Sequence, residues 1–219
     1  MHSKTTNSLF IFSRYIIGLV LLLNAHLVSA DDFSAEIKSY ITNIKSIAVE
    51  FKQSDTGGQI ARGMLIIDKP YKFRCNYYEP FPIMIIGNKN YVSVYDYEME
   101  NLSRIKADEN IFNFLLVDKI SFDDQFEILF AKEQGKHYII KLKHNGLNKI
   151  SEIAFDRNSK QIQWMKIFEE NNTITLTFGK TQVIQGVAKS LFIIKDPDIF
   201  DKPVRLNKTQ LQKRFKVVS

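Results

Sequence analysis

The 219-residue sequence has little of several residue types: one cysteine, one tryptophan, five prolines and nine glycines. A single cysteine, Cys75, excludes an intramolecular disulfide, so the hydrophobic core alone must stabilise the fold. HExxH, CxxC, P-loop, GxGxxG and G-x-S-x-G motifs are all absent, and no histidines have the spacing of metal ligands. The sequence therefore predicts a protein that is not an enzyme and has no catalytic residue, metal or cofactor.

The excess of basic over acidic residues is also small. The chain has 30 basic and 24 acidic residues. Without Lys4 and Arg14, which belong to an N-terminal leader, 28 basic residues remain and the formal charge is +4. No basic cluster is interleaved with aromatic residues, which argues against nucleic acid as a partner. An apolar content of 45% excludes general disorder, and the length is that of one domain.

The first thirty residues have the pattern of a secretory signal peptide. Lys4 and Arg14 precede the apolar residues 15–23, which are too few to span a bilayer comfortably, and Val28-Ser29-Ala30 forms a cleavage site. We therefore expect residues 1–30 to be removed and residues 31–219 to form a single domain. Without a cysteine at the cleavage site, the mature protein should be soluble. An uncleaved membrane anchor is the alternative.

Residues 63–106 carry the strongest strand pattern. Proline and Gly/Asn turns separate β-branched and aromatic runs, which predicts five strands in an antiparallel meander. A helix over residues 31–47 precedes it, and a second group of strands follows, ending in a strand at 191–195. The predicted fold class is α+β with a single large, curved antiparallel sheet.

Two segments have more than one interpretation. A short apolar helix predicted at about residues 109–117 would either plug one end of the sheet or lie across a cavity as a lid. The C-terminal residues 202–219 contain six Lys or Arg and no acid. They would form either a solvated tail or a docking surface for an acidic partner or an anionic membrane.

The meander, GMLIIDKPYKFRCNYYEPFPIMIIGNKNYVSVYDYEMENLSR, resembles the central block of the periplasmic outer-membrane lipoprotein carrier family, LolA. The family pattern runs roughly G-x-L, K-R-P, F-R-W-x-Y, x-x-P and Y-D-P. Three positions depart from it: Lys69 replaces an arginine, Cys75 replaces a tryptophan and Lys89 replaces a turn glycine. The matching residues are Gly63, Leu65, Pro70, Phe73, Arg74, Tyr77, Pro80, Tyr95 and Asp96.

This resemblance implies a half-open β-barrel whose concave apolar face is covered by a lid of short α-helices. It implies that Lys69 makes the lid-to-sheet contact, without the planar fork of arginine. The implied acyl-chain site consists of Leu65, Ile67, Phe73, Cys75, Tyr77, Ile83, Ile85 and Ile153, and the implied lid of Ile37, Tyr40, Ile41, Phe114, Leu115 and Leu116.

The function implied is that of a soluble, monomeric chaperone in the periplasm of a Gram-negative bacterium. It would bind the acyl chains of lipoproteins released from the inner membrane and deliver them to the outer membrane. Its implied partners are acylated lipoproteins, an ATP-driven release complex of the inner membrane and an outer-membrane lipoprotein receptor. A periplasmic carrier or sensor of another lipid or hydrophobic ligand is the alternative on the same fold.

Overall fold

The computed structural model describes residues 30–78, 80–107, 112, 115–117, 126–147 and 149–218. The signal segment up to residue 29, Phe114 and most of the helix predicted at 109–117 lie outside the described residues. Within the described part of the chain, no helix is both long and apolar enough to cross a membrane.

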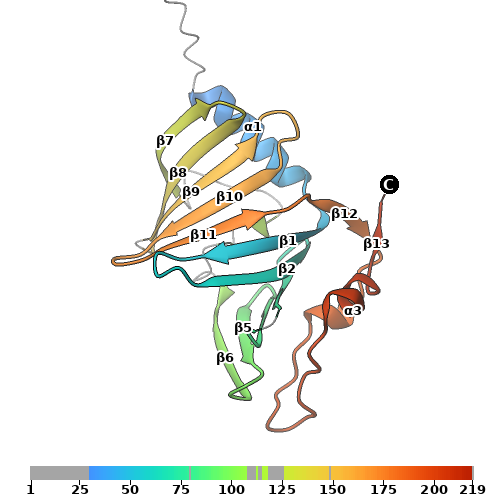
Figure 1. Cartoon of the computed structure of the whole chain (residues 1–219). Helices are drawn as coiled ribbons and strands as arrows, with labels where there is room; N and C mark the ends of the chain where they lie inside the picture. Colours follow the sequence, from blue (N-terminus) through green and yellow to red (C-terminus); the bar gives the residue numbers. More distant parts are fainter. Residues whose placement is uncertain are drawn as a thin grey trace, which may run out of the picture.

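One antiparallel sheet dominates the structure (Figure 1). Its continuous order is β6-β5-β4-β3-β2-β1-β11-β10-β9-β8-β7, and β12 pairs with both β1 and the short β13. The sheet is not closed, because β6 and β7 remain at opposite edges. The strands are β1 (Ser46–Ser54), β2 (Ile60–Asp68), β3 (Lys72–Tyr77), β4 (Ile83–Gly87), β5 (Tyr91–Asp96), β6 (Asn101–Lys106), β7 (Phe126–Gln134), β8 (His137–His144), β9 (Lys149–Asp156), β10 (Ile162–Phe168), β11 (Thr173–Phe178), β12 (Gln182–Gln185) and β13 (Lys216–Val217).

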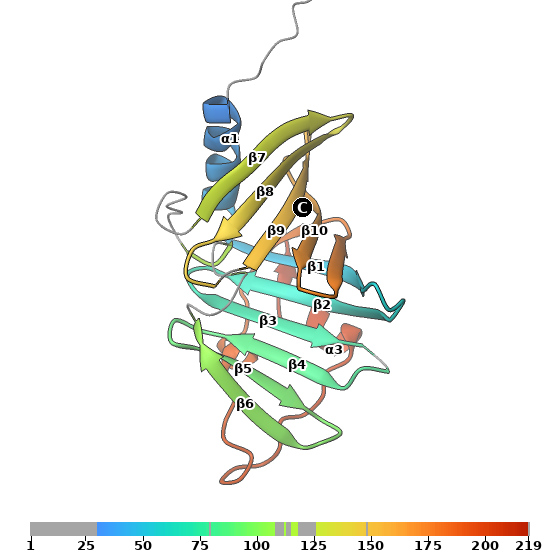
Figure 2. The same ribbon diagram turned by 90° about the vertical axis from the view of Figure 1, so that its left-hand side faces the viewer.

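The sheet consists of two meanders, β1–β6 and β7–β11, joined where β1 pairs with β11. Phe51 is opposite Phe178 in this pairing, and Gln53 is opposite Leu176. The two halves turn strongly relative to each other (Figure 2), as expected for a large twisted sheet. The prediction of a single large antiparallel sheet is confirmed, including the five strands within residues 63–106.

Helix α1 (Ala30–Asn43) is shorter than predicted, because the chain already enters β1 at Ser46. Its apolar side chains Ile37 and Ile41 pack into the largest hydrophobic cluster, which includes residues from both halves of the sheet. The aromatic ring of Tyr40 contacts that of Phe155 edge-on, with 5.7 Å between the ring centres. We call the face of the sheet that bears this cluster the cavity face.

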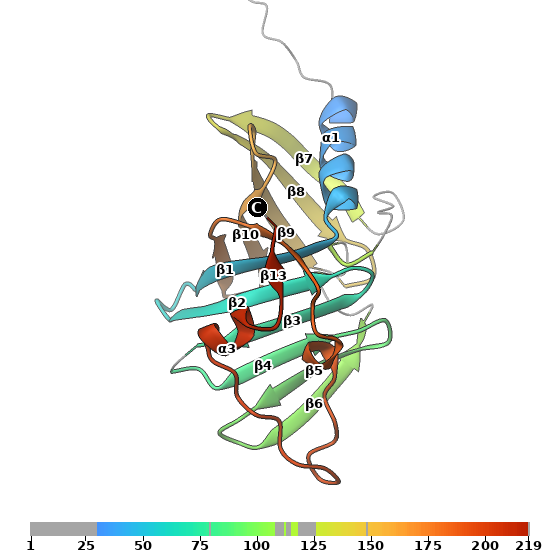
Figure 3. The same cartoon turned by 90° about the vertical axis from the view of Figure 1, so that its right-hand side faces the viewer.

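The opposite face of β1–β5, here called the back face, is covered by the C-terminal residues 186–218 (Figure 3). The strand predicted at 191–195 is wrong: Leu191 and Phe192 belong to a 3₁₀ helix, η3 (Lys189–Phe192), whose buried side chains pack against β1 and β2. Short apolar runs of this kind fit a strand and a buried helical turn equally well.

The C-terminal residues are not simply a solvated tail. Leu211, from the short helix α3 (Lys208–Gln212), is fully buried, and Phe215 is 8% exposed. A capping box starts α3, in which the backbone N–H of Gln210 donates to Asn207 Oδ1 and that of Asn207 donates to Gln210 Oε1, each at 2.9 Å. Charged side chains of this segment pair with the sheet, for example Lys208 with Glu50 at 2.5 Å.

Candidate functional site

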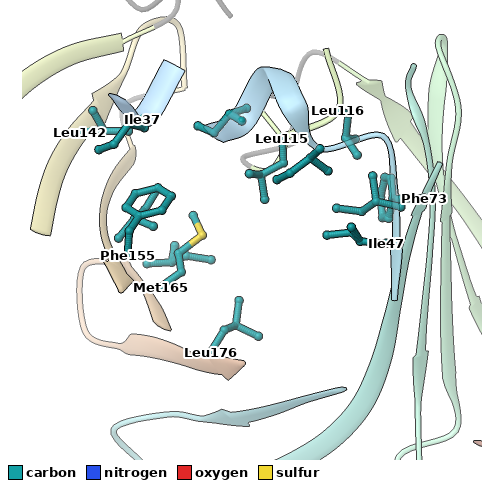
Figure 4. Packing of buried hydrophobic residues seen from close by; sticks show 14 of the residues in the cluster. Ile37, Ile47, Phe73, Leu115, Leu116, Leu142, Phe155, Met165 and Leu176 are labelled. Carbon is teal, nitrogen blue, oxygen red and sulfur yellow. The ribbon is translucent and has the colours of Figure 1, made fainter. Parts of the chain in front are cut away.

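The cavity face contains an apolar cavity of about 370 Å³ between the two halves of the sheet. In Figure 4, labelled side chains of the surrounding cluster extend from both halves around an open space, with Leu115 and Leu116 beside them. The residues that border the cavity are Phe51, Gln53, Leu65, Ile67, Phe73, Cys75, Tyr77, Ile85, Val92, Val94, Ile105, Phe112, Leu115, Leu116, Ile167, Ile174, Leu176 and Phe178.

Alternation along β3 explains how one strand serves both faces. Phe73, Cys75 and Tyr77 border the cavity, whereas Arg74 and Asn76 point to the back face. Exposure increases along the cavity side: Phe73 is 6% and Cys75 9% exposed, and Tyr77 is only partly buried. One end of the cavity is therefore more enclosed than the other along this strand.

Two glycines let aromatic rings lie close to the sheet and form the cavity floor. A Cβ atom at Gly87 would overlap the Phe73 ring, and one at Gly63 would overlap the Phe51 ring. Both glycines are therefore required by close approach, and each one fixes where a large ring lies. Phe51 in turn packs edge-on against Tyr77, with 5.3 Å between the ring centres.

At the enclosed end of the cavity, hydrogen bonds connect the β2–β3 turn to neighbouring segments. The backbone N–H of Tyr71 donates to the carbonyl oxygen of Leu116 at 2.9 Å, next to the cavity-bordering Leu115. The ammonium group of Lys69 donates to the carbonyl oxygen of Ile41, near the end of α1, at 2.6 Å. A basic side chain at a helix C-terminus also complements the partial negative charge there.

The structure brings together most of the sheet residues implied by the resemblance. Leu65, Ile67, Phe73, Cys75, Tyr77 and Ile85 all border the cavity, as do Leu115 and Leu116. Five others do not border it. Ile83 lies on the same face of β4, two residues before Ile85. Ile37, Tyr40, Ile41 and Ile153 lie within or against the surrounding cluster.

Ten of the residues that border the cavity were not predicted from the sequence. Phe51 and Gln53 share one face of the alternating segment IAVEFKQS, so the period of β1 could have indicated them. Leu176 and its neighbours come to the cavity only through the β1–β11 pairing, which no local pattern reveals. The remaining missed residues are Val92, Val94, Ile105, Phe112, Ile167, Ile174 and Phe178.

The cavity offers little chemistry beyond apolar contact. Burial raises the pKa of the Cys75 thiol to about 12, so the thiolate required of a nucleophile is negligible at neutral pH. Gln53 and Tyr77 form a neutral pair, in which the Tyr77 hydroxyl donates to Gln53 Oε1 at 2.8 Å. Among the described bordering residues none is charged, and the described residues contain no group of three potential metal ligands.

Comparison with known proteins assigns the family. Residues 42–195 match the family model described as outer membrane lipoprotein carrier protein LolA. The chain therefore belongs to the LolA family, which confirms the resemblance found in the meander.

Individual relatives extend over most of the chain. Protein RP864 of Rickettsia prowazekii, which is described as uncharacterized, is 48% identical over 185 residues, 84% of this chain and 87% of its own. The outer-membrane lipoprotein carrier protein of Francisella philomiragia is 25% identical over 196 residues, 85% of this chain and 94% of its own. Among solved structures, the LolA superfamily protein NE2245 from Nitrosomonas europaea aligns with a TM-score of 0.45 and 8% identity, over 73% of this chain and 97% of its own.

Proposed function

We propose that this protein is a non-enzymatic periplasmic chaperone that carries the acyl chains of lipoproteins from the inner to the outer membrane. The observation that supports this most directly is the apolar cavity on the face of an open sheet, in a chain of the LolA family. A 16-carbon acyl chain loses about 12 kcal/mol of favourable burial on entering water, at ~0.8 kcal/mol per CH₂. A portable apolar cavity offsets this cost without any chemical step.

In this proposal the sheet is a half-open barrel, and α1 together with the segment around Leu115 forms its lid. Helix α1 contacts both halves of the sheet: Glu36 pairs with Lys160 at 2.8 Å on one side, and Lys69 holds the Ile41 carbonyl on the other. Weakening these two contacts would let α1 move away from the sheet and widen the space between the halves, which stay joined through β1 and β11. A volume of about 370 Å³ is small for a cavity that holds drug-sized ligands, so binding more than one acyl chain requires such opening.

Hand-over follows from the same geometry. If the empty cavity closes on its own apolar side chains, opening it subtracts from the affinity for cargo. The donor in this proposal is an ATP-driven release complex of the inner membrane, and the acceptor is a lipoprotein receptor of the outer membrane. Residues 1–30 are the cleaved signal peptide that directs the chain to the periplasm, and residues 31–219 work as a monomer.

Mass spectrometry of what co-purifies with the mature protein from the periplasm tests the proposal. We expect diacylated or triacylated proteins to co-purify with the wild type. Free lipid alone would contradict lipoprotein carriage and favour a carrier of another lipid on this fold.

A pair of charge substitutions connects the result to the cavity. Leu65→Glu places a carboxylate on the cavity border and should abolish cargo capture. Ile128→Glu, on a β7 position that is 38% exposed and outside the cavity border, is the matched control and should retain cargo. Equal cargo recovery from both variants would mean that the cavity is not the binding site.

A further inference from the structure

The polar side-chain groups among the described residues that border the cavity are few, and two of them are joined by a hydrogen bond. Gln53 from β1 and Tyr77 from β3 both border it and share the 2.8 Å hydrogen bond between the Tyr77 hydroxyl and Gln53 Oε1. Apart from the Cys75 thiol, every other described bordering side chain is a hydrocarbon. In such surroundings, the unused hydrogen-bond donors and acceptors of this pair determine which polar atom of a ligand can be accommodated nearby.

The pair has a hydrogen-bond donor to spare. The amide oxygen of Gln53 accepts from Tyr77, and the Gln53 amide nitrogen has no hydrogen-bond partner within the described part of the chain. If the amide were turned over, the nitrogen would donate to the hydroxyl oxygen and the Tyr77 O–H would be free instead. Either arrangement leaves an N–H or O–H available to an acceptor atom of the ligand.

This donor is neutral, which restricts the acceptor. Burial raises the pKa of Tyr77, so the hydroxyl keeps its proton at physiological pH. No lysine, arginine or histidine is among the described bordering residues, so an ionised carboxylate would find no counter-charge there. A neutral carbonyl oxygen, by contrast, needs only one hydrogen bond to be satisfied.

The position of the pair also suits the polar end of an amphiphile. On β3, Tyr77 lies two residues beyond Cys75 and four beyond Phe73, away from the enclosed end where Leu116 contacts the β2–β3 turn. On β1, exposure likewise increases from Phe51, at 5%, to the partly buried Gln53. A chain that enters with its methyl end toward Phe73 would bring its first carbons, and the carbonyl attached to them, toward Gln53 and Tyr77.

We infer that Gln53 and Tyr77 form a carbonyl-recognition site that selects ester- or amide-linked acyl chains over free fatty acids and plain hydrocarbons. This inference rests on the proposed acyl-chain cavity and adds to it the chemical form of the chain. Tyr77 acts both as donor to Gln53 and as the group that fixes its orientation, and Gln53 presents the donor to the ligand.

Competition binding with three probes of similar length tests the site. Methyl dodecanoate, dodecanoate and tridecane each displace the neutral dye N-phenyl-1-naphthylamine from the mature protein at pH 7.5. For the wild type we expect the ester to bind more tightly than the carboxylate. In Gln53→Leu and Tyr77→Phe, the affinity ratio of ester to alkane should fall roughly three- to tenfold, the effect of one neutral hydrogen bond.

Matched substitutions elsewhere serve as controls. Tyr91→Phe, at a position that is 50% exposed, and Gln134→Leu, at the exposed end of β7, lie outside the cavity border and should leave the ratio unchanged. Circular dichroism verifies that all four variants fold. An unchanged ratio in both cavity variants would overturn the carbonyl site while leaving the acyl-chain cavity intact. If neither ester nor alkane displaced the dye, the proposed function would fail as well.

Discussion

The two faces of strands β1–β5 are both apolar, yet only one of them is filled. On the back face, Met64 and Ile66 are 2% and 0% exposed beneath the C-terminal segment. On the cavity face of the same strand, Leu65 is only partly buried and borders empty space. Composition is therefore a poor guide to which face of this sheet contains a cavity. The difference lies in whether the chain supplies its own covering.

The faces also differ in how they hold polar groups. The back face buries a charged residue, Arg74, which is 5% exposed and has no ion pair in the described part of the chain. It donates instead to Asn76 Oδ1 at 2.5 Å and to the Leu191 carbonyl at 3.0 Å, and burial lowers its pKa. The cavity face, in contrast, holds neutral pairs such as Gln53 with Tyr77. A permanently filled face can surround a charge with fixed partners, whereas a cavity that accepts hydrocarbon, as proposed here, cannot.

The largest effect should come from the same substitution made on the two faces. Leu211→Ala removes a fully buried side chain from the filled face and should lower the free energy of unfolding by about 2–5 kcal/mol. Leu65→Ala removes a side chain that already borders a cavity. Fewer contacts are therefore lost, and the free energy of unfolding should fall by only about 1 kcal/mol. Urea unfolding of both variants measures the difference. Equal costs would show that the cavity is closed and packed in solution.

A smaller effect should follow from creating charge on the cavity side by acid. His144 is 3% exposed, packs edge-on against Phe126 and bonds Ser151 Oγ at 2.9 Å. Burial, followed by the nearby Lys149, lowers its pKa from 6.5 to about 4. The unfolded chain therefore takes up a proton near pH 6.5 while the folded protein does not, and stability falls as the pH drops from 6.5 to 4.

We expect this loss to reach about 2–3 kcal/mol at pH 4. His144→Gln lacks this titration, and the carboxylates that also titrate are common to both proteins. The difference between their urea midpoints across this pH range therefore isolates His144. Parallel pH profiles would indicate that the imidazole is accessible to solvent and not enclosed by the cavity-side cluster.

The smallest effect concerns the contact between α1 and the sheet. Lys69→Met removes the hydrogen bond to the Ile41 carbonyl and should cost about 1–2 kcal/mol. Limited proteolysis should then cut near the end of α1 sooner than in the wild type. Lys89→Met changes an exposed lysine in the β4–β5 turn and is the matched control. Cleavage unchanged by Lys69→Met would show that other contacts hold the helix.

Local sequence patterns were sufficient to predict the residues of β2, β3 and β4 that border the cavity. The alternation of Phe73, Cys75 and Tyr77 has a period of two, so a correctly placed strand fixes which side chains share a face. Proline and asparagine turns located those strands to within a few residues. Sharing a face does not determine how far along a strand a cavity extends, and Ile83 shares the face of Ile85 without bordering the cavity.

The other half depended on pairings between distant parts of the chain. Leu176 and Ile167 border the cavity because β11 joins β1, and two meanders could have been joined in other ways. For the C-terminal segment, the solvated-tail alternative was wrong for a different reason. Its six cations suggested solvent or an acidic partner, but Leu206, Leu211 and Phe215 between them pack on the back face. Lysine and arginine at the surface do not prevent the residues between them from being buried.

The pairing of Phe51 with Phe178 also has a consequence for folding. Each meander contains mostly local pairings, which form early because short loops close at low entropic cost. The β1–β11 junction joins strands that are far apart in the sequence, so we expect it to form late. Until it does, both apolar walls are exposed to water and prone to self-association. A protein proposed to shield the hydrocarbon of others would then be most vulnerable to aggregation during its own synthesis and folding.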